Sequence, residues 1–437
     1  MTSTLSIIGT GYLGATYAAC MSSLGHTVIG IDTNAEKVAQ LSRGELPFYE
    51  PGLADLLKIE IASGRLTFTT EFSAAAHADV HFICVGTPQK ENSLAADLSY
   101  VEGALTSIAP YLKSGSLVVG KSTVPVGTAQ KLIAQLATLA PEADLAWNPE
   151  FTREGFAVQD SLRPDRIVVG VTNDQAEDIL RSVYAPLLEI GTPWIRADLP
   201  TAELVKVAAN SFLATKISFI NAMAEVCEAS GGDVTVLATA IGYDPRIGNK
   251  FLKAGIGFGG GCLPKDIRAF IARAEELGAT QALEFLRDID SINLRARQRV
   301  IDVVRAQLSE DLTLYKIAIL GAAYKPDSDD VRDSPALDIA VQLHAAGAKV
   351  TVHDPKAVIN ARQRFPSLTY TENVEECISD SDLVLHLTEW REYRELSPEI
   401  LFTLAKTPRI VDGRNALDRD RWVSAGWKFH ALGRANA

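Results

Sequence analysis

The chain has 437 residues, which is more than one hydrophobic core usually organises, and we therefore expect two or three domains. Its 42 basic and 54 acidic residues give a formal net charge of −12, and no basic run stands out. This balance argues against nucleic acid or an anionic membrane surface as a partner. No stretch approaches the ~20 apolar residues of a membrane span. The start, MTSTLSIIGTGYLG, has no charged leader, so we expect a soluble, cytoplasmic protein.

The opening of the chain has the order strand, glycine turn, helix, strand, acid. The apolar run LSIIG leads into the loop Gly9-x-Gly11-x-x-Gly14, and the strand TVIGI ends at Asp32, about 20 residues further on. Glycines let the backbone approach a pyrophosphate at a helix N-terminus, and Asp32 can accept ribose hydroxyls while repelling a 2′-phosphate. The complete pattern favours NAD as cofactor over a glycine-rich turn without a ligand.

Further strands are expected in the runs VHFICVG (80–86), SLVVGKS (116–122), LAWNP (145–149) and RIVVG (166–170). Helical segments separate them, and this alternation predicts a doubly wound parallel sheet. We therefore place an NAD-binding Rossmann-like domain at residues 1–199.

The middle of the chain is predicted to be helical. Residues 201–229 have apolar side chains at helical spacing, with Thr201 able to cap the start and two glycines after the end. Further helices are expected around 264–278 and 281–308. A helical domain at 200–310 would bridge two α/β units.

After residue 313 the opening pattern returns. KIAILGAAYKP (316–326) resembles the first strand and loop, and GAKVTVHD (347–354) keeps the glycine-to-aspartate spacing of GHTVIGID (25–32). SDLVLHLTEW (381–390) resembles the later strand VHFICVG. We expect a second Rossmann-like domain at 311–437, whose first loop lacks the glycine triplet and carries Lys325. A phosphate-bearing ligand other than a dinucleotide fits this loop better.

The five cysteines contain no CxxC pair, and their odd number argues against a disulfide framework or a zinc site, so no metal is expected. Three of them, Cys20, Cys84 and Cys227, lie in apolar helical or strand segments and are expected to be buried. In GFGGGCLPKDIR (257–268), by contrast, Cys262 lies in a glycine loop at or just before a predicted helix N-terminus.

This position favours chemistry at the Cys262 thiol. The partial positive charge of a helix N-terminus and the neighbouring Lys265 both lower the pKa of a thiol and make it a nucleophile. Asp266, one turn along the helix, would flank the same space. The alternative is a cysteine that only fills a gap in a glycine-rich loop.

Polar residues elsewhere are open to two interpretations. Glu150 and Glu154 in NPEFTREG follow a strand end, where ligands of α/β sheets bind, but a surface loop also carries solvated acids. Lys206 and Asn210 share a face of the long helix and interrupt an apolar stretch. A buried network and a substrate site explain this pair equally well.

Together these segments resemble the UDP-glucose 6-dehydrogenase branch of the nucleotide-sugar dehydrogenases. The resemblance covers nearly the whole chain, in order. It rests on the glycine triplet, CVGTP (84–88), KSTVPVGT (121–128), NPEF-x-REG (148–155), AELVKVAANSFLATKISFIN (202–221), RIG-x-x-FL-x-AG-x-GFGG-x-C-x-PKD (246–266) and YKPDSDDVRDSPAL (324–337). It implies oxidation of the C6 alcohol of UDP-glucose to the carboxylate of UDP-glucuronate, a precursor for polysaccharides, with two NAD molecules.

The resemblance also implies roles for individual residues. Cys262 would form a thiohemiacetal and then a thioester, Lys206 with Asn210 would stabilise the developing oxygen charge, and Glu150 would serve thioester hydrolysis. Asp266 and Thr123 would hold a proton-relaying water. For NAD the matching residues are Gly9, Gly11, Tyr12, Leu13, Gly14, Asp32, Lys37, Thr87, Thr123, Glu154, Lys265 and Arg332. For the sugar nucleotide they are Glu150, Phe151, Lys206, Asn210, Arg246, Phe251, Leu252, Gly259, Cys262 and Lys325.

A homodimer is implied as well, with Arg246 reaching the partner's ligand. The chain departs from the usual pattern at Gly261, where serine is common, at Leu263, where phenylalanine is common, and at Thr152, where leucine is frequent. GDP-mannose or another nucleotide sugar is therefore the alternative substrate. A two-electron hydroxyacid-type dehydrogenase and a catalytically silent nucleotide-sensing protein are the alternative functions.

Overall fold

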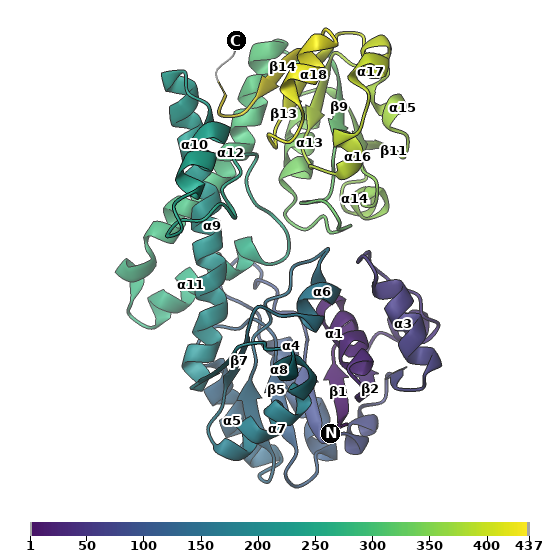
Figure 1. Cartoon of the computed structure of the whole chain (residues 1–437), viewed down its shortest axis with the longest axis vertical. Helices are drawn as coiled ribbons and strands as arrows, with labels where there is room; N and C mark the ends of the chain where they lie inside the picture. Colours follow the sequence, from purple (N-terminus) through teal and green to yellow (C-terminus); the bar gives the residue numbers. More distant parts are fainter. Residues whose placement is uncertain (1, 435–437) are drawn as a thin grey trace. The chain divides into compact units, whose positions relative to one another are not determined.

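The computed structural model describes residues 2–434, and the chain divides into two compact units (Figure 1). The first unit runs to Ala209 and includes Arg268–Gly278; the second consists of Asn210–Ile267 and the chain from Ala279 onward. Among the described residues, no helix has the length and apolarity needed to cross a membrane.

The first unit is built on a sheet with the strand order β3-β2-β1-β4-β5-β6-β7-β8. Pairing is parallel except between β6 and β7, which meet antiparallel at Trp147 and Gly170, so the predicted parallel sheet is confirmed as far as β6. The strands are β1 (Thr4–Ile8), β2 (Thr27–Ile31), β3 (Leu66–Thr69), β4 (Val80–Ile83), β5 (Leu117–Gly120), β6 (Asp144–Trp147), β7 (Ile167–Gly170) and β8 (Trp194–Ala197).

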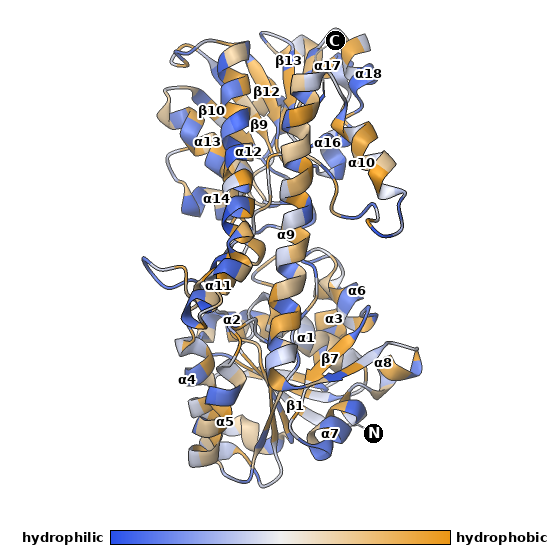
Figure 2. Cartoon of the chain, turned by 90° about the vertical axis from the view of Figure 1, so that its left-hand side faces the viewer, coloured by the Kyte–Doolittle hydropathy of each residue, from blue (hydrophilic) through white to orange (hydrophobic). Residues whose placement is uncertain are grey.

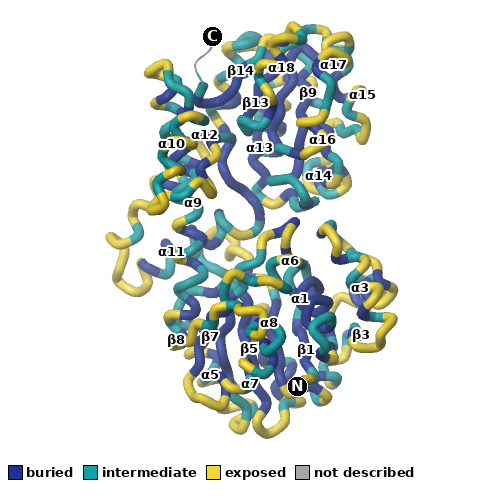
Figure 3. Tube along the Cα trace, in the orientation of Figure 1, coloured by how far each residue is buried: buried dark blue, intermediate teal, exposed yellow. Residues whose placement is uncertain are grey.

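Helices cover this sheet, and every residue of β4, β5 and β7 is buried, as expected for strands packed on both faces (Figure 3). The helices are α1 (Tyr12–Ser23), α2 (Ala35–Ser42), α3 (Leu53–Ala62), α4 (Ser99–Ile108), α5 (Thr128–Leu139), α6 (Ala157–Leu162), α7 (Asp174–Val183) and α8 (Ala185–Glu189), with 3₁₀ turns η1 (Phe72–His77) and η2 (Ala109–Tyr111).

The predicted helical middle is present. It consists of α9 (Leu199–Ser230), α10 (Val234–Gly242), α11 (Leu263–Glu276), the 3₁₀ turn η3 (Thr280–Leu283) and α12 (Phe285–Gln307). The start of α9 differs from the expectation, because Oδ1 of Asp198, rather than the Thr201 side chain, accepts the backbone N–H of Thr201 at 2.7 Å. Helix α9 ends before Gly231, whose positive φ of 79° suits glycine.

The second unit contains an all-parallel sheet with the order β11-β10-β9-β12-β13-β14, which repeats the order of β3 to β6 in the first unit. The strands are β9 (Lys316–Leu320), β10 (Lys349–His353), β11 (Thr369–Thr371), β12 (Leu383–His386), β13 (Arg409–Asp412) and β14 (Lys428–Ala431). The helices are α13 (Pro335–Ala345), α14 (Val358–Arg364), α15 (Val374–Ile378), α16 (Arg391–Arg394), α17 (Pro398–Leu404) and α18 (Arg419–Ser424).

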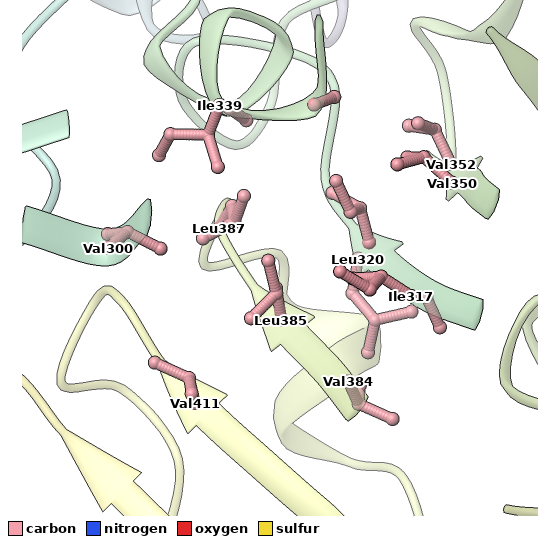
Figure 4. Packing of buried hydrophobic residues seen from close by; sticks show 14 of the residues in the cluster. Val300, Ile317, Leu320, Ile339, Val350, Val352, Val384, Leu385, Leu387 and Val411 are labelled. Carbon is pink, nitrogen blue, oxygen red and sulfur yellow. The ribbon is translucent and has the colours of Figure 1, made fainter. Parts of the chain in front are cut away.

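The core of the second unit joins its sheet to α12. Val300 of α12 and Ile339 of α13 belong to the same buried cluster as Leu385 of β12 and Val411 of β13 (Figure 4). This packing fixes α12 against the sheet, and α12 in turn contacts the glycine loop described below.

Candidate active site

The glycine loop between β1 and α1 has the form expected for a diphosphate-binding turn. A Cβ at Gly14 would lie 1.8 Å from the carbonyl oxygen of Gly9, and Gly9 has a positive φ of 88°, so neither position tolerates a side chain. Helix α1 begins without a side-chain cap and without an acidic residue in its first turn. Its first N–H groups are therefore suited to an anion. The predicted cofactor residues Gly9, Gly11, Tyr12, Leu13 and Gly14 all lie in this loop and first turn.

Asp32 follows β2 and faces the same loop. Its Oδ2 accepts the backbone N–H of Thr10 at 2.8 Å and Nζ of Lys37 at 2.9 Å, and its Oδ1 accepts the backbone N–H of Asn34 at 2.9 Å. Burial opposes ionisation, but these donors hold the pKa of Asp32 below its usual value. The Lys37 ammonium is a movable donor and can give way to a ribose hydroxyl.

Other predicted cofactor residues lie after neighbouring strands of this sheet. Oγ1 of Thr87, after β4, donates to the carbonyl oxygen of Thr123, after β5, at 2.8 Å. Glu154 is buried in the segment after β6. The sequence analysis missed Glu50, a buried carboxylate that accepts the N–H groups of Gly155 at 2.6 Å and Ala157 at 2.7 Å.

Glu50 also accepts the hydroxyl of Tyr12, and so ties the first turn of α1 to the segment that contains Glu154. Burial and then Glu50 raise the pKa of Tyr12 well above its usual value. Tyr12 therefore remains a neutral hydrogen-bond donor.

Glu150 is the centre of a largely buried set of charges in the first unit. Its Oε1 accepts the backbone N–H groups of Phe151 and Thr152, both at 2.7 Å, and its Oε2 lies 3.3 Å from Nζ of Lys121. Burial opposes ionisation, but Lys121, these N–H groups and Lys206 together hold the pKa of Glu150 below its usual value. The side chain is 16% exposed, so the alternative of a solvated surface acid is wrong.

Lys206 belongs to the first unit, where its Nζ lies 5.6 Å from the centre of the Phe151 ring. Asn210, one turn further along α9, belongs to the second unit. Nδ2 of Asn210 donates to Oδ2 of Asp266 at 2.7 Å, and Nζ of Lys265 contacts Oδ1 of the same carboxylate at 2.6 Å. Asn210 is thus part of a network in which Asp266 is 2% exposed.

Cys262 immediately precedes α11 and is exposed, whereas Cys20, Cys84, Cys227 and Cys377 are buried. Its carbonyl oxygen accepts the N–H of Asp266 at 3.0 Å, which begins the helix. The structure therefore places this thiol at a helix N-terminus, as the sequence predicts.

The glycines before Cys262 allow close contacts with neighbouring elements. A Cβ at Gly257 would lie 2.5 Å from Oδ1 of Asn293, on α12, which instead accepts the N–H of Phe258 at 2.7 Å. A Cβ at Gly261 would lie 2.3 Å from Cζ of Arg332. The departure from serine at this position therefore lets the Arg332 guanidinium, a predicted cofactor contact, lie directly against the loop.

The other predicted sugar-nucleotide residues of the second unit lie between α10 and α11 and in the loop after β9. Phe251 has a positive φ of 62°, a strained conformation for an aromatic residue, and Leu252 beside it is buried. Arg246 is 87% exposed at its side chain and pairs with Asp244 at 2.6 Å. Gly259 and Lys325 lie in the glycine loop and in the loop after β9, respectively.

Arg414, after β13, was not predicted. It donates to the carbonyl oxygens of Leu387 at 2.8 Å, Gly257 at 3.1 Å and Tyr324 at 3.1 Å, and so links the glycine loop to two strand ends. Burial lowers the pKa of Arg414. The signal was its position in VDGRN, directly after an apolar strand.

The loop after β9 differs from its counterpart after β1. Oδ2 of Asp354, the counterpart of Asp32, accepts the N–H groups of Ala322 at 2.8 Å and Ala323 at 2.9 Å and the indole N–H of Trp390 at 3.1 Å. These donors belong to the backbone or to a buried ring and cannot move aside. The Ser334 side chain also caps α13. Asp354 thus differs from Asp32, whose Lys37 contact is movable.

The family models match three consecutive parts of the chain. Residues 3–188 match the NAD binding domain of the UDP-glucose/GDP-mannose dehydrogenase family, residues 200–295 its central domain, and residues 318–419 its UDP binding domain. The chain belongs to this family. The predicted family and NAD as the cofactor are confirmed.

Relatives within the UDP-glucose/GDP-mannose dehydrogenase family match along the full length. The chain is 40% identical to a UDP-glucose 6-dehydrogenase of Rhizobium meliloti, over 98% of this chain and 99% of the relative. It is 39% identical to one of Bacillus subtilis, over 98% and 93%. A UDP-glucose dehydrogenase structure from Pyrobaculum islandicum is similar with a TM-score of 0.91 at 36% identity, over 100% of this chain and 98% of that one. The predicted fold is confirmed.

Proposed function

We propose that this dehydrogenase oxidises UDP-glucose to UDP-glucuronate, with two NAD and one water consumed for each sugar. Its UDP-glucose 6-dehydrogenase relatives support this substrate. A GDP-mannose dehydrogenase structure from Pseudomonas aeruginosa is a weaker match, with a TM-score of 0.54 at 29% identity. The observation that carries the four-electron chemistry is Cys262 at the start of α11, because a two-electron dehydrogenase needs no thiol.

The thiol makes the second oxidation, from aldehyde to carboxylate, possible. An aldehyde loses hydride only after a nucleophile has added to its carbonyl carbon, and the Cys262 thiolate forms that C–S bond to give a thiohemiacetal. Loss of hydride converts the adduct to a thioester. Water then adds to the thioester carbonyl, the C–S bond breaks, and the carboxylate and the thiol are released. NAD, when bound, accepts the hydride lost in each oxidation.

The polar groups around these steps have separate tasks. Lys206 and Asn210 stabilise the negative oxygen that develops at C6, and Glu150 takes the proton of the water that attacks the thioester. Asp266 and Thr123 hold the water that relays protons. The bond between Asn210 and Asp266 supports this assignment, because it fixes the amide and the carboxylate to each other at 2.7 Å.

A homodimer is part of the proposal. Phe212, Phe219 and Val226 are 67%, 47% and 56% exposed, and their seven-residue spacing places them on one face of α9 as an apolar stripe. Figure 2 shows that α9 carries hydrophobic residues along much of its length. Such a stripe suits the same stripe of a second copy. Arg246 would then contact the partner's ligand. The division into domains at 1–199, 200–310 and 311–437 and the cytoplasmic location remain predictions.

Two variants test the proposed chemistry. Cys262→Ala should form almost no carboxylate, because nothing captures the aldehyde. Glu150→Gln should complete both hydride transfers but stall at the thioester, giving a burst of two NADH per site and then slow turnover. Intact-protein mass spectrometry of Glu150→Gln mixed with UDP-glucose and NAD should show a covalent adduct.

The adduct should be absent when Cys262 is also replaced by alanine. Glu142→Gln, at an exposed carboxylate of the same unit, is the matched control and should behave as the unmodified enzyme. Undiminished carboxylate formation by Cys262→Ala, with no adduct in Glu150→Gln, would contradict a thioester mechanism.

A further inference from the structure

Directly after β5 the chain buries a lysine side chain for which neither the sequence analysis nor the proposed chemistry has a role. The side chain of Lys121 is 5% exposed. Its Nζ donates to Oδ1 of Asn148 at 2.9 Å, lies 3.3 Å from Oε2 of Glu150, and is 4.4 Å from the centre of the Tyr17 ring. An ion removed from water costs several kcal/mol unless such partners compensate it, so packing alone does not explain a charge here.

The partners of Lys121 are themselves held in place. Nδ2 of Asn148 donates to the carbonyl oxygen of Val168, on β7, at 2.8 Å, which turns its Oδ1 toward Lys121. The hydroxyl of Tyr184 donates to the same Oδ1, and Tyr17 and Tyr184 share a hydrogen bond of 2.6 Å. The ammonium therefore sits at a position defined by strands β5 to β7 and helix α1.

Two cations act on Glu150 from different elements. Lys121 follows β5 and makes the ion pair, while Lys206 on α9 contributes at longer range. Burial opposes the charge of Lys121, but its neighbours, among them the Glu150 carboxylate, raise the pKa of Lys121 above the usual value. Burial raises the pKa of four further groups, which therefore stay neutral at pH 7: Tyr17, Cys20, Cys84 and Tyr184.

We propose that Lys121 is a positioning residue, which keeps the Glu150 carboxylate charged and correctly oriented for hydrolysis of the Cys262 thioester. It acts through Glu150 and does not touch the substrate. The backbone N–H groups of Phe151 and Thr152 fix one carboxylate oxygen, and Lys121 fixes the other. This inference rests on the proposed function, in which Glu150 is the base.

The decisive measurement is the rate of thioester hydrolysis as a function of pH. Lys121→Met keeps the length of the side chain and removes its charge. We follow decay of the covalent adduct by rapid quench and intact-protein mass spectrometry after mixing enzyme, UDP-glucose and NAD. The acid limb of the hydrolysis profile should move up by about one pH unit or more, because Glu150 loses its nearest positive charge.

Two further variants separate positioning from a general structural role. In Lys121→Met/Glu150→Gln the loss of Lys121 should add almost nothing to the slow hydrolysis of Glu150→Gln, because the group through which Lys121 acts is already absent. Lys131→Met, at an exposed lysine of α5 in the same unit, is the matched control and should leave the profile unchanged.

The outcomes distinguish this inference from the proposed function. An adduct in Glu150→Gln, together with an unshifted profile in Lys121→Met, overturns the role of Lys121 alone; no adduct in Glu150→Gln overturns the proposed function. If Lys121→Met does not fold, the folding of Lys121→Met/Glu150→Gln tests the proposal. Folding regained by Glu150→Gln supports the charge pairing, whereas failure of both shows that Lys121 serves the core independently of Glu150 and overturns the proposal.

Discussion

Asp32 shows how a buried acid can select a ligand. Its carboxylate stays ionised because the N–H groups of Thr10 and Asn34 and the Lys37 ammonium surround it. A 2′-phosphate would bring a second negative charge to this point. A free ribose hydroxyl, in contrast, replaces the movable Lys37 contact with a hydrogen bond to the carboxylate.

We therefore expect a clear preference for NAD over NADP in kcat/KM. Asp32→Asn should lower this preference by about tenfold or more, equivalent to ~1.4 kcal/mol, because the repulsion is removed. Steady-state kinetics with both cofactors measure the ratio, and Asp55→Asn, at an exposed acid of the same unit, should not change it. Comparable kcat/KM values for the two cofactors in the unmodified enzyme would show that Asp32 does not discriminate.

Residues of the site differ in how far the sequence reveals them. Asp32 and Cys262 are recognisable because each has a fixed place in a local pattern of strand, turn and helix. Lys121 and Glu50 are not, because their partners are distant in the chain: Asn148 is 27 residues from Lys121, and Gly155 is 105 residues from Glu50. In the sequence, a buried charged residue whose partner is distant cannot be told from a charged residue in solvent.

A side chain from another helix caps the start of helix α5. Glu203 on α9 accepts the N–H groups of Gly127 and Ala129, both at 2.6 Å, at the start of α5, and is 2% exposed. Burial raises its pKa from 4.5 to about 7, although these N–H groups and Arg273 act in the opposite direction.

A raised pKa in the folded state gives a defined pH dependence. The carboxyl group adds to the free energy of unfolding below about pH 4.5, and this contribution declines as pH rises through about 7. Between about pH 5 and about pH 8, the unfolding temperature should therefore fall less for Glu203→Gln than for the unmodified enzyme. Glu203→Ala, which leaves the N–H groups of Gly127 and Ala129 without this acceptor, should lower the free energy of unfolding by about 1–3 kcal/mol. Parallel pH profiles for Glu203→Gln and the unmodified enzyme would contradict this view of Glu203.

Helices with a long apolar periodicity and strands at the centre of a sheet could be predicted from the sequence. The bounds of α9 lie within two residues of the expected 201–229, and the central strands β1, β2, β4 and β5 coincide with apolar runs. The edge strand β8 was missed, because its outer position leaves the two middle residues of Trp194–Ala197 exposed and removes the apolar signal. The reversal at β7 was also missed, since strand direction has no signature in a four-residue run.

The proposed dimer would pair two copies of the chain through helix α9. The apolar stripe of Phe212, Phe219 and Val226 on α9 is exposed in the single chain, and so is Arg246. If Arg246 completes the partner's site, a dimer of Arg246→Ala with Cys262→Ala has one site with both groups intact.

Mixing the two inactive variants in equal amounts, after dissociation and reassociation, should therefore restore about a quarter of the unmodified activity. Half of the dimers are then mixed, and each mixed dimer has one complete site. Arg246→Ala mixed with the double variant Arg246→Ala/Cys262→Ala is the control and should stay inactive. No recovery in the first mixture would show that each chain completes its own site.

Fixed donors bind the Asp354 carboxylate, and this matters for an enzyme that binds two nucleotides at once. Both ligands present a ribose and a diphosphate, and the second sheet repeats the strand order of β3 to β6 in the first, so each ligand could in principle compete for the other's place. Trp390 and the backbone N–H groups of Ala322 and Ala323 already occupy Oδ2 of Asp354, whereas Asp32 keeps the movable Lys37 contact. A large excess of NAD should therefore leave the sugar nucleotide undisturbed.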